Sequence, residues 1–446
     1  MDNTFSSFSP TLRSILEQGT YLIVRDFGGQ KALLNRVHRL IKEKAEQLHG
    51  PGARSTLERE GLTVLHKVLS AKDITALRDE VMEKIRPALF DLTVEIARDL
   101  LGIKGEFFVD EYTILRMNYP YLVAMQAPES AENPGIGRTS HKVKELSKAS
   151  RVVDPVYNPK AYHNFEPPPA WAHGPHQDTW TGHSRLGVNL WWAIDEVFEE
   201  NSMVFYPETF GLSYAPDPRS LYLASGFPLP KPSKMALRAG EMIIFNPEML
   251  HGTHLNSTDR TRIALSTRIN ARKPTFDPGC FYAREFWHSS EDLERKDYEK
   301  VIRFERAQNL NSEPVQIKEA KPTAHPELIL ENGLQDGLWI RVCESERIAP
   351  RAKLQIRRGS ERILIYRGDE RLYATQSQCA HLDVSLVDGF HDERTIFCPA
   401  HALAFSLEFG VSSCPSLTLR TYPVKEQEGV IWLQLLEHTE ARAEKS

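Results

Sequence analysis

The sequence predicts a mostly β protein with flanking helices, divided into two domains. Its 446 residues exceed the roughly 100–200 of an ordinary domain, and a large β fold reaches only about 250. Short β-rich runs occupy residues 176–271 and are separated by Gly, Pro, Asn and Asp. This pattern of short strands and turns is typical of a β-sandwich or small β-barrel. A second set of β-like runs, from "LWIRVC" to "GVIWLQLL", follows a Pro-, Lys- and Glu-containing stretch.

These patterns set the expected boundaries. We place an N-terminal domain at 1–310, a linker at 311–335 and an all-β domain at 336–438. The N-terminal domain opens with the β-like run "YLIVRDF" and two segments with apolar residues at helical spacing. A polar, proline-rich stretch at 127–170 predicts a long loop bordering a site, which we interpret as a lid.

Composition narrows the class of protein. Charged residues make up 26% and hydrophobic residues 41%, which predicts a soluble globular chain. The net charge of -5 does not provide the positively charged surface that a nucleic-acid-binding protein needs, so we expect no nucleic acid as partner. We find no apolar run of membrane-spanning length and no signal peptide, so we expect a cytoplasmic protein without a membrane partner. Five scattered cysteines do not form a disulfide framework.

Two of the cysteines belong to a metal-binding pattern near the C-terminus. Cys379 and His381 form C-x-H, and Cys398 and His401 form C-x-x-H. Two thiolates and two neutral imidazoles are the ligands of a Rieske [2Fe–2S] centre. A zinc site is the alternative for a Cys2His2 set, although zinc motifs usually pair Cys with Cys and His with His.

Residues 336–437 resemble the Rieske family. The strands before the ligands and "FSLEFG", "CP" and "YPV" after them agree with that family. Its high-potential members carry an extra Cys beside each ligand pair, where this chain has Val384 and Ala400. The resemblance is therefore to the ferredoxin-type modules that feed electrons to oxygenases.

A second metal pattern lies in the N-terminal domain. His176 and Asp178 stand at i and i+2, which on an extended strand places both side chains on one face. His251 follows a predicted strand, and Arg262 stands on the next one. Two His and one carboxylate bind Fe(II) on one face and leave positions open for a keto acid and O2. An Arg suits the far carboxylate of the keto acid, because the planar guanidinium group can donate hydrogen bonds to both carboxylate oxygens.

From about residue 21 to 271 the chain resembles the phytanoyl-CoA dioxygenase family of Fe(II)/2-oxoglutarate oxygenases, through "HQD", "ENSMVFYPETFG" and "HGTHLNSTDRTR". The resemblance implies a double-stranded β-helix of the jelly-roll or cupin type. It also implies the iron ligands His176, Asp178 and His251, and Arg262 as the carboxylate-binding residue. Further cosubstrate-pocket candidates are Thr253, Trp191 and, by strand parity with Trp191, Asn189.

Several neighbours compete for these roles. His254 could replace His251 as a ligand, but the spacing to Arg262 favours His251. Arg268 shares the parity of Arg262 and lies too far along the strand to share one small dicarboxylate, so it faces either substrate or the rim. The presence of Asp178 argues against the halogenases of this fold, which lack that carboxylate.

The resemblances together imply an oxygenase that hydroxylates an unactivated C–H bond of a small organic molecule with O2 and 2-oxoglutarate, giving succinate and CO2. The Rieske cluster would keep or return the mononuclear iron to Fe(II). The alternatives are a Rieske-driven oxygenase that uses external electrons without 2-oxoglutarate, and a non-catalytic redox or oxygen sensor. We expect an external reductase or ferredoxin as partner. Electron transfer within one chain and between chains both remain open, so a homo-oligomer is a hypothesis.

Overall fold

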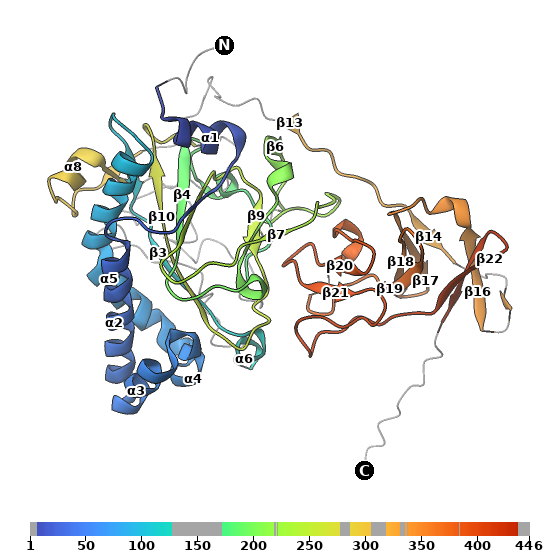
Figure 1. The fold of residues 1–446 in the computed structure, drawn as a ribbon. Coiled ribbons are helices and arrows are strands. Elements are labelled where there is room, and N and C mark those ends of the chain that lie inside the picture. Colours follow the sequence, from blue (N-terminus) through green and yellow to red (C-terminus); the bar gives the residue numbers. More distant parts are fainter. Residues whose placement is uncertain are drawn as a thin grey trace. The chain divides into compact units, whose positions relative to one another are not determined.

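The computed structural model describes residues 7–126, 172–217, 220, 222–276, 286–304, 318–330, 335–336, 338–382 and 384–435 (Figure 1). The chain divides into two compact units. Unit 1 comprises Met1–Ala224 and Ser233–Ala320, and unit 2 comprises Ser225–Pro232 and Lys321–Ser446. The loop expected at 127–170 lies outside the described residues. No helix within the described ranges has both the length and the apolar character needed to cross a membrane.

A large antiparallel sheet organises unit 1 (Figure 1). Its centre is the long strand β10, which pairs with β4 on one side and with β3 and β2 on the other. The mostly β content with flanking helices is confirmed. In sheet order the strands are β1 (Leu22–Val24), β8 (Met242–Phe245), β4 (Gly187–Ala193), β10 (Arg262–Asn270), β2 (Phe108–Asp110), β11 (Phe286–Ser289) and β12 (Ile302–Arg303), with β3 (Ile114–Asn118) beside β10.

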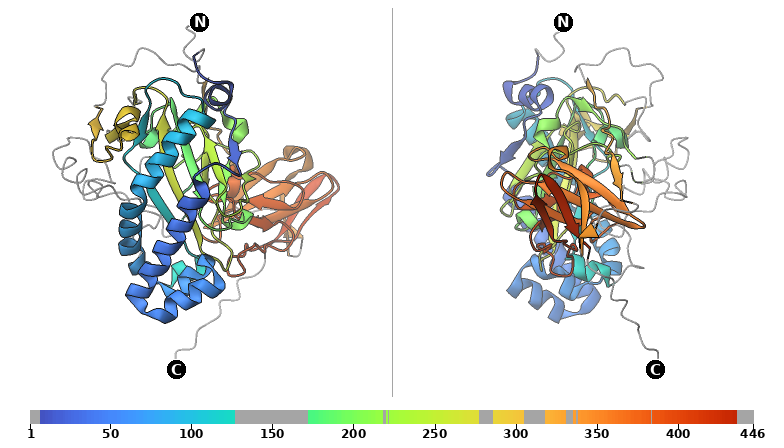
Figure 2. Two further views of the ribbon diagram at one scale, coloured as in Figure 1. Left: turned by 60° about the vertical axis from the view of Figure 1, so that its left-hand side comes forward. Right: turned by 90° about the vertical axis from the view of Figure 1, so that its right-hand side faces the viewer.

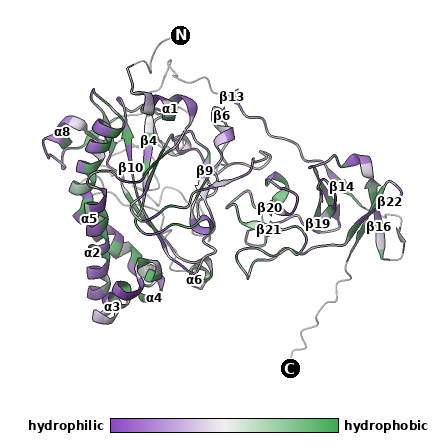
Figure 3. Ribbon diagram, viewed as in Figure 1, coloured by the Kyte–Doolittle hydropathy of each residue, from purple (hydrophilic) through white to green (hydrophobic). Residues whose placement is uncertain are grey.

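Helices α2 and α5 cover one face of this sheet (Figures 1 and 2). Both carry hydrophobic and hydrophilic residues along their length, as Figure 3 shows. α5 begins at a capping box in which Ser70 and Asp73 satisfy each other's backbone N–H groups. The α-helices are α1 (Pro10–Gln18), α2 (Gln30–His49), α3 (Pro51–Glu60), α4 (Leu65–Val68), α5 (Ala71–Glu95), α6 (Tyr121–Met125) and α8 (Ser290–Glu294).

The other face of the sheet points into the interior of unit 1. Val188, Leu190 and Trp192 of β4 join the core that includes helix residues, whereas Trp191 and Ala193 join a second core with residues of β5 and β8. This separation follows from the two-residue side-chain period of a strand. β4 is buried along its whole length, and its sequence is apolar on both faces except at Asn189, rather than alternating.

A three-stranded sheet packs against that interior face. Its order is β7 (Ser233–Lys234), β5 (Met203–Phe205) and β9 (His251–Thr253). Met203 and Phe205 of β5 share the second core with Trp191 of β4. A short parallel pair, β6 (Leu212–Ser213) and β13 (Lys318–Glu319), completes the described strands of unit 1.

Unit 2 is an all-β unit with its own core of Ile, Leu and Val residues. β14 lies in the stretch expected to be a linker and pairs with β17, whereas β15 begins at the last residue of that stretch and pairs with β16. One sheet has the order β14 (Glu327–Ile329), β17 (Lys353–Arg358), β18 (Glu361–Arg367), β19 (Leu372–Gln376). A second has β15 (Gln335–Asp336), β16 (Trp339–Glu344), β23 (Val430–Gln434), β22 (Val424–Gln427), and a third pairs β20 (Thr395–Phe397) with β21 (Ala404–Ser406).

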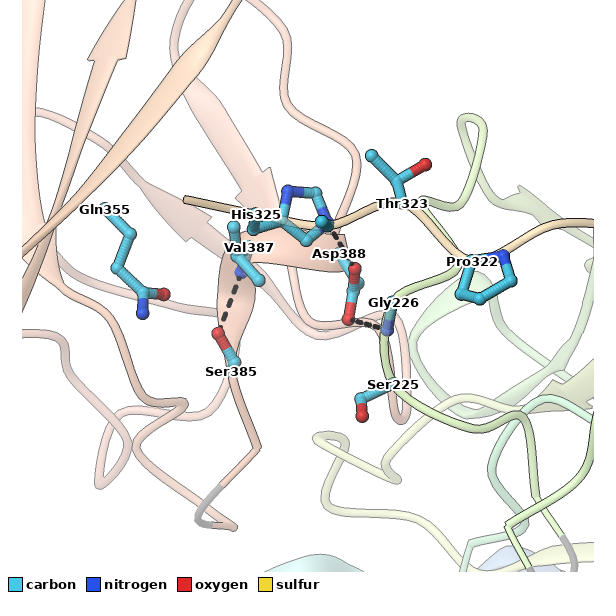
Figure 4. Close-up of a pocket in the computed structure, with 10 residues that line it drawn as sticks. Ser225, Gly226, Pro322, Thr323, His325, Gln355, Ser385, Val387 and Asp388 are labelled. Atoms are coloured by element: carbon cyan, nitrogen blue, oxygen red, sulfur yellow. Dashed lines mark hydrogen bonds and ion pairs between the residues drawn. The ribbon is translucent and has the colours of Figure 1, made fainter. Parts of the chain in front are cut away.

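Residues 225–232 lie in the sequence between two stretches of unit 1 but belong to unit 2. Asp388 anchors them. Its carboxylate accepts a hydrogen bond from Gly226 N–H at 2.9 Å (Figure 4). Its carbonyl accepts one from Leu229 N–H at 2.9 Å. His325 lies 2.8 Å from the same carboxylate. Gly226 adopts φ +91°, which disfavours any other residue. These groups border an open pocket of about 510 Å³ within unit 2.

Candidate metal centres

His176, Asp178 and His251 meet in the interior of unit 1, with one potential ligand atom from each lying within 4.8 Å of the others. His176 Nε2 is 3.5 Å from Asp178 Oδ1, and His251 Nε2 is 3.9 Å from Asp178 Oδ2. His251 lies on β9. His254 is buried nearby, but its Nδ1 lies 2.6 Å from the carbonyl of Leu255 and it is not part of the group.

Backbone pairing brings the three ligands together. His176 and His251 exchange N–H···O bonds of 2.8 and 3.0 Å, and Asp178 N–H donates to Pro247 O at 2.8 Å. The expected regular strand stops at Asp178, which begins a 3-10 turn, Asp178–Thr181. Gln177, between the ligands, donates from its side-chain amide to the carbonyls of Leu212 and Glu248 at 2.9 Å each.

Both imidazoles are oriented by backbone carbonyls. His176 Nδ1 lies 2.8 Å from Gly174 O, and His251 Nδ1 lies 2.8 Å from Met249 O. A carbonyl only accepts, so each Nδ1 carries the proton and each Nε2 presents its lone pair. Burial and the adjacent His176 lower the pKa of His251 to about 3. Its ring is therefore neutral at pH 7, the form that binds a metal.

The carboxylate ligand is held by β4. Asn189 donates its side-chain N–H to Asp178 Oδ2 at 2.7 Å, which places Asn189 beside the ligand. Burial opposes ionisation of Asp178, yet the positive field of its neighbours, His183 and Arg268 among them, holds its pKa well below its usual value. Two imidazoles and one carboxylate fit an Fe(II) site.

The predicted cosubstrate residues line the same interior. The guanidinium carbon of Arg262 lies 5.7 Å from the ring centre of Trp191, and Thr253 follows His251 two positions along β9. Arg262 Nη1 donates to Asn201 O at 3.0 Å, whereas its buried Nε has no hydrogen-bond partner among the described residues. Arg268 is buried too, 3.7 Å from Asp110, and so does not lie on an exposed rim.

Three further residues, Arg116, His173 and Tyr222, lie beside the candidate iron site. Arg116 of β3 donates to His173 Nε2 at 3.3 Å, and His173 Nδ1 lies 3.2 Å from the hydroxyl of Tyr222. The Tyr222 ring packs so closely on Gly174 that a Cβ there would lie 2.8 Å from the ring. These contacts join distant parts of the chain, and no local sequence pattern marks them.

The second metal centre lies in unit 2. Cys379, His381 and Cys398 each offer a ligand atom within 4.8 Å of the others, and the ring centre of His401 lies 4.7 Å from that of His381. Each Cys begins a loop closed by its own N–H: Cys379 donates to Val384 O and Cys398 to Leu403 O, both at 2.9 Å.

The two thiols are electrostatically linked. The Cys398 thiol, by hydrogen bonding to Cys379, lowers the pKa of Cys379 to about 5, and the same interaction raises the pKa of Cys398. One thiolate is therefore available at pH 7, and the nearby imidazole of His381 favours it further. Two Cys and two His in this arrangement fit a Rieske cluster.

Comparisons with known proteins agree with both centres. A family model described as phytanoyl-CoA dioxygenase (PhyH) matches residues 57–264, and one described as Rieske [2Fe-2S] domain matches 338–423. Ferredoxin CarAc from Metapseudomonas resinovorans is 30% identical over 99 residues, covering 22% of this chain and 92% of that protein. The 3-phenylpropionate/cinnamic acid dioxygenase ferredoxin subunit of Escherichia coli (strain K12) is 35% identical over 78 residues, covering 17% of this chain and 74% of that protein.

One similar solved structure is a "Complex of reduced oxygenase and oxidized ferredoxin in carbazole 1,9a- dioxygenase", with 29% identity, coverage of 23% of this chain and 100% of that chain, and a TM-score of 0.21. The two domain matches and the two ligand groups support a non-haem iron oxygenase. The chain belongs to the Rieske [2Fe-2S] family through its C-terminal part and carries a phytanoyl-CoA dioxygenase domain before it. The expected order of the two domains is confirmed.

Proposed function

We propose that the protein is an Fe(II)/2-oxoglutarate-dependent hydroxylase whose Rieske domain maintains the iron in the Fe(II) state. The observation that carries the proposal is the pairing of a His–Asp–His group with a buried Arg262 on the same interior. A Rieske oxygenase driven by external electrons has no evident use for a buried cation beside Trp191. The two sheets that enclose the group support a double-stranded β-helix.

Each residue then has a defined task. His176, Asp178 and His251 hold the iron on one side and leave the opposite side open. Arg262 binds the far carboxylate of 2-oxoglutarate, and its Nε and remaining N–H donors supply a bidentate contact. Trp191 forms a wall that excludes water, and Thr253 offers a hydroxyl close to the ligand strand. With iron and 2-oxoglutarate bound, O2 yields a hydroxylated substrate, succinate and CO2.

The Rieske domain is not required for the electron balance of that reaction, because the keto acid and the substrate together supply four electrons to O2. We therefore assign it to repair: its cluster would supply one electron, drawn from an external reductase or ferredoxin, to return ferric mononuclear iron to Fe(II). Cys379, His381, Cys398 and His401 hold its cluster.

Binding of 2-oxoglutarate tests the assignment of Arg262 directly. Anaerobic Fe(II)-loaded protein is titrated with 2-oxoglutarate, and calorimetry gives its Kd. Arg262→Ala should raise that Kd about 100-fold, since a charged hydrogen-bonded pair contributes about 1.5–3 kcal/mol. Arg260→Ala is the matched control, because its side chain is 48% exposed. Equal Kd values for wild type and Arg262→Ala would contradict the assignment.

A further inference from the structure

A buried turn at residues 246–249 connects β8 of the large sheet to the three-stranded sheet, where β9 begins. Connections between strands usually run over the surface, because backbone polar groups that leave water need partners. All four residues of this turn are buried instead. Their carbonyl groups must therefore be satisfied inside the protein, and the groups that satisfy them are fixed with the turn.

Two of these carbonyls hold iron ligands directly. Pro247 O accepts a hydrogen bond from Asp178 N–H at 2.8 Å. Met249 O lies 2.8 Å from His251 Nδ1, which donates to it. The turn thus sets where the main chain of Asp178 lies and how the imidazole of His251 is rotated. A shift of the turn would displace both ligands together.

Asn246 closes the turn with two acceptors. Its carbonyl accepts from Met249 N–H at 3.0 Å, and its side-chain Oδ1 accepts from Glu248 N–H at 2.7 Å. Asn at the first position and Pro247 at the second are favoured in β-turns, and an Asn side chain commonly bonds the backbone two residues on. The closed turn presents Glu248 O to the side-chain amide of Gln177, which stands between two iron ligands.

The side chain of Asn246 also reaches helix α1. Its Nδ2 donates to Ile15 O at 3.4 Å and to Leu16 O at 3.2 Å. These carbonyls belong to the last turn of α1, where helix carbonyls have no intrahelical partner. Asn246 is only 2% exposed, so water does not replace these bonds easily. One carboxamide therefore joins the N-terminal helix to the turn that holds the ligands.

We propose that Asn246 is a positioning residue of the mononuclear iron site, which it serves by fixing the turn at residues 246–249 and tying that turn to α1. It acts through the carbonyls that hold Asp178 and His251 and does not contact the metal. The inference rests on the iron site of the proposed function and not on its cosubstrate. Loss of Asn246 should consequently change metal binding in addition to stability.

Metal binding by the full-length protein tests the proposal. Anaerobic competition with a chelator gives the Kd of Fe(II). Electron paramagnetic resonance of Co(II) bound at the same site reports the ligand geometry, because the oxidised cluster is silent in that measurement. Asn246→Ala should raise the Kd of Fe(II) about tenfold and change the Co(II) signal. Asn246→Asp keeps an acceptor for Glu248 N–H, so it should recover part of the affinity and a more nearly wild-type signal.

Asn256→Ala is the matched control. Asn256 is also 2% exposed, and its Oδ1 accepts from the N–H two residues on, that of Thr258. Its Nδ2 donates to the carbonyls of Asn118 and Arg260. Within the part of the chain that the structure describes, these bonds do not involve an iron ligand. Both alanine variants should lower the unfolding temperature by a similar amount, but only Asn246→Ala should alter metal binding.

Gln177→Met provides a second route to the same turn if Asn246→Ala does not fold. It removes the bond to Glu248 O and leaves Asn246 in place, so the Co(II) signal should change here too. A wild-type Kd and Co(II) signal in Asn246→Ala, or in Gln177→Met where Asn246→Ala does not fold, would overturn the proposal. Equal changes in Asn256→Ala would also overturn it. If wild type binds Fe(II) but not 2-oxoglutarate, the proposed function fails while the role of Asn246 stands.

Discussion

The mononuclear site takes its ligands from strand and turn positions between two sheets, whereas the cluster site takes them from two loops of unit 2. His176 and His251 are distant in sequence and are joined by backbone bonds, and Asn189 on a third element holds Asp178. Each cluster loop instead closes on itself, through the bonds of Cys379 to Val384 and of Cys398 to Leu403. The mononuclear site therefore depends on long-range register, and the cluster site on local geometry.

Removal of one ligand from each site should have the largest effect and should show whether the sites assemble independently. Asp178→Ala should lower iron from about three to about two atoms per chain and keep the cluster absorption, because the remaining imidazoles bind Fe(II) weakly. Cys398→Ala should leave about one atom and lose the cluster absorption. Asp259→Ala is the control, since its side chain is 96% exposed. Loss of both centres in either variant would show that assembly is coupled.

Loss of the Asn189 contact should have the next largest effect. Asn189→Ala removes a 2.7 Å hydrogen bond to the carboxylate ligand, and partners of this kind typically contribute 10- to 100-fold to metal affinity. We expect Fe(II) affinity, measured by competition with a chelator, to fall by about tenfold or more, with cluster absorption unchanged. Asn35→Ala, on the exposed side of α2, is the control. Unchanged Fe(II) affinity in Asn189→Ala would remove Asn189 from the metal site.

The smallest effect is expected at Asp388 of unit 2, which is not one of the cluster residues. Asp388→Ala removes the acceptor of Gly226 N–H and the partner of His325, and should destabilise unit 2 by about 1–3 kcal/mol. The measurement is the temperature at which cluster absorption is lost, compared with Asp369→Asn, an exposed residue paired with Arg351. An exposed pair contributes about 0–1 kcal/mol. Equal shifts in the two variants would contradict the anchoring role of Asp388.

The same contrast explains what the sequence could predict. C-x-H and C-x-x-H are local patterns, so they indicated the cluster ligands before the fold was known. The mononuclear ligands were predicted because His176 and Asp178 stand only two positions apart on the chain and the family resemblance implied His251.

Other features could not be predicted from the sequence because they depend on contacts between distant segments of the chain. Asn189 was expected in the cosubstrate pocket by strand parity, and its hydrogen bond to Asp178 follows from a turn at 178–181 that the parity argument did not include. The sequence placed residues 225–232 inside the N-terminal domain, but Asp388 draws them into unit 2. Arg116 and His173 are 57 residues apart in the sequence, so no local pattern indicates their contact.

The most direct test of the account is succinate release from 2-oxoglutarate by anaerobically purified, Fe(II)-loaded protein exposed to O2, beside Arg262→Ala and His381→Ala. We predict that wild type forms succinate in a first turnover without any external reductant, and that Arg262→Ala does not. His381→Ala should begin at the wild-type rate and lose activity over successive turnovers, even when reductase is supplied. If no succinate forms until a ferredoxin reductase is added, 2-oxoglutarate is not the cosubstrate and the Rieske domain is the source of the catalytic electrons.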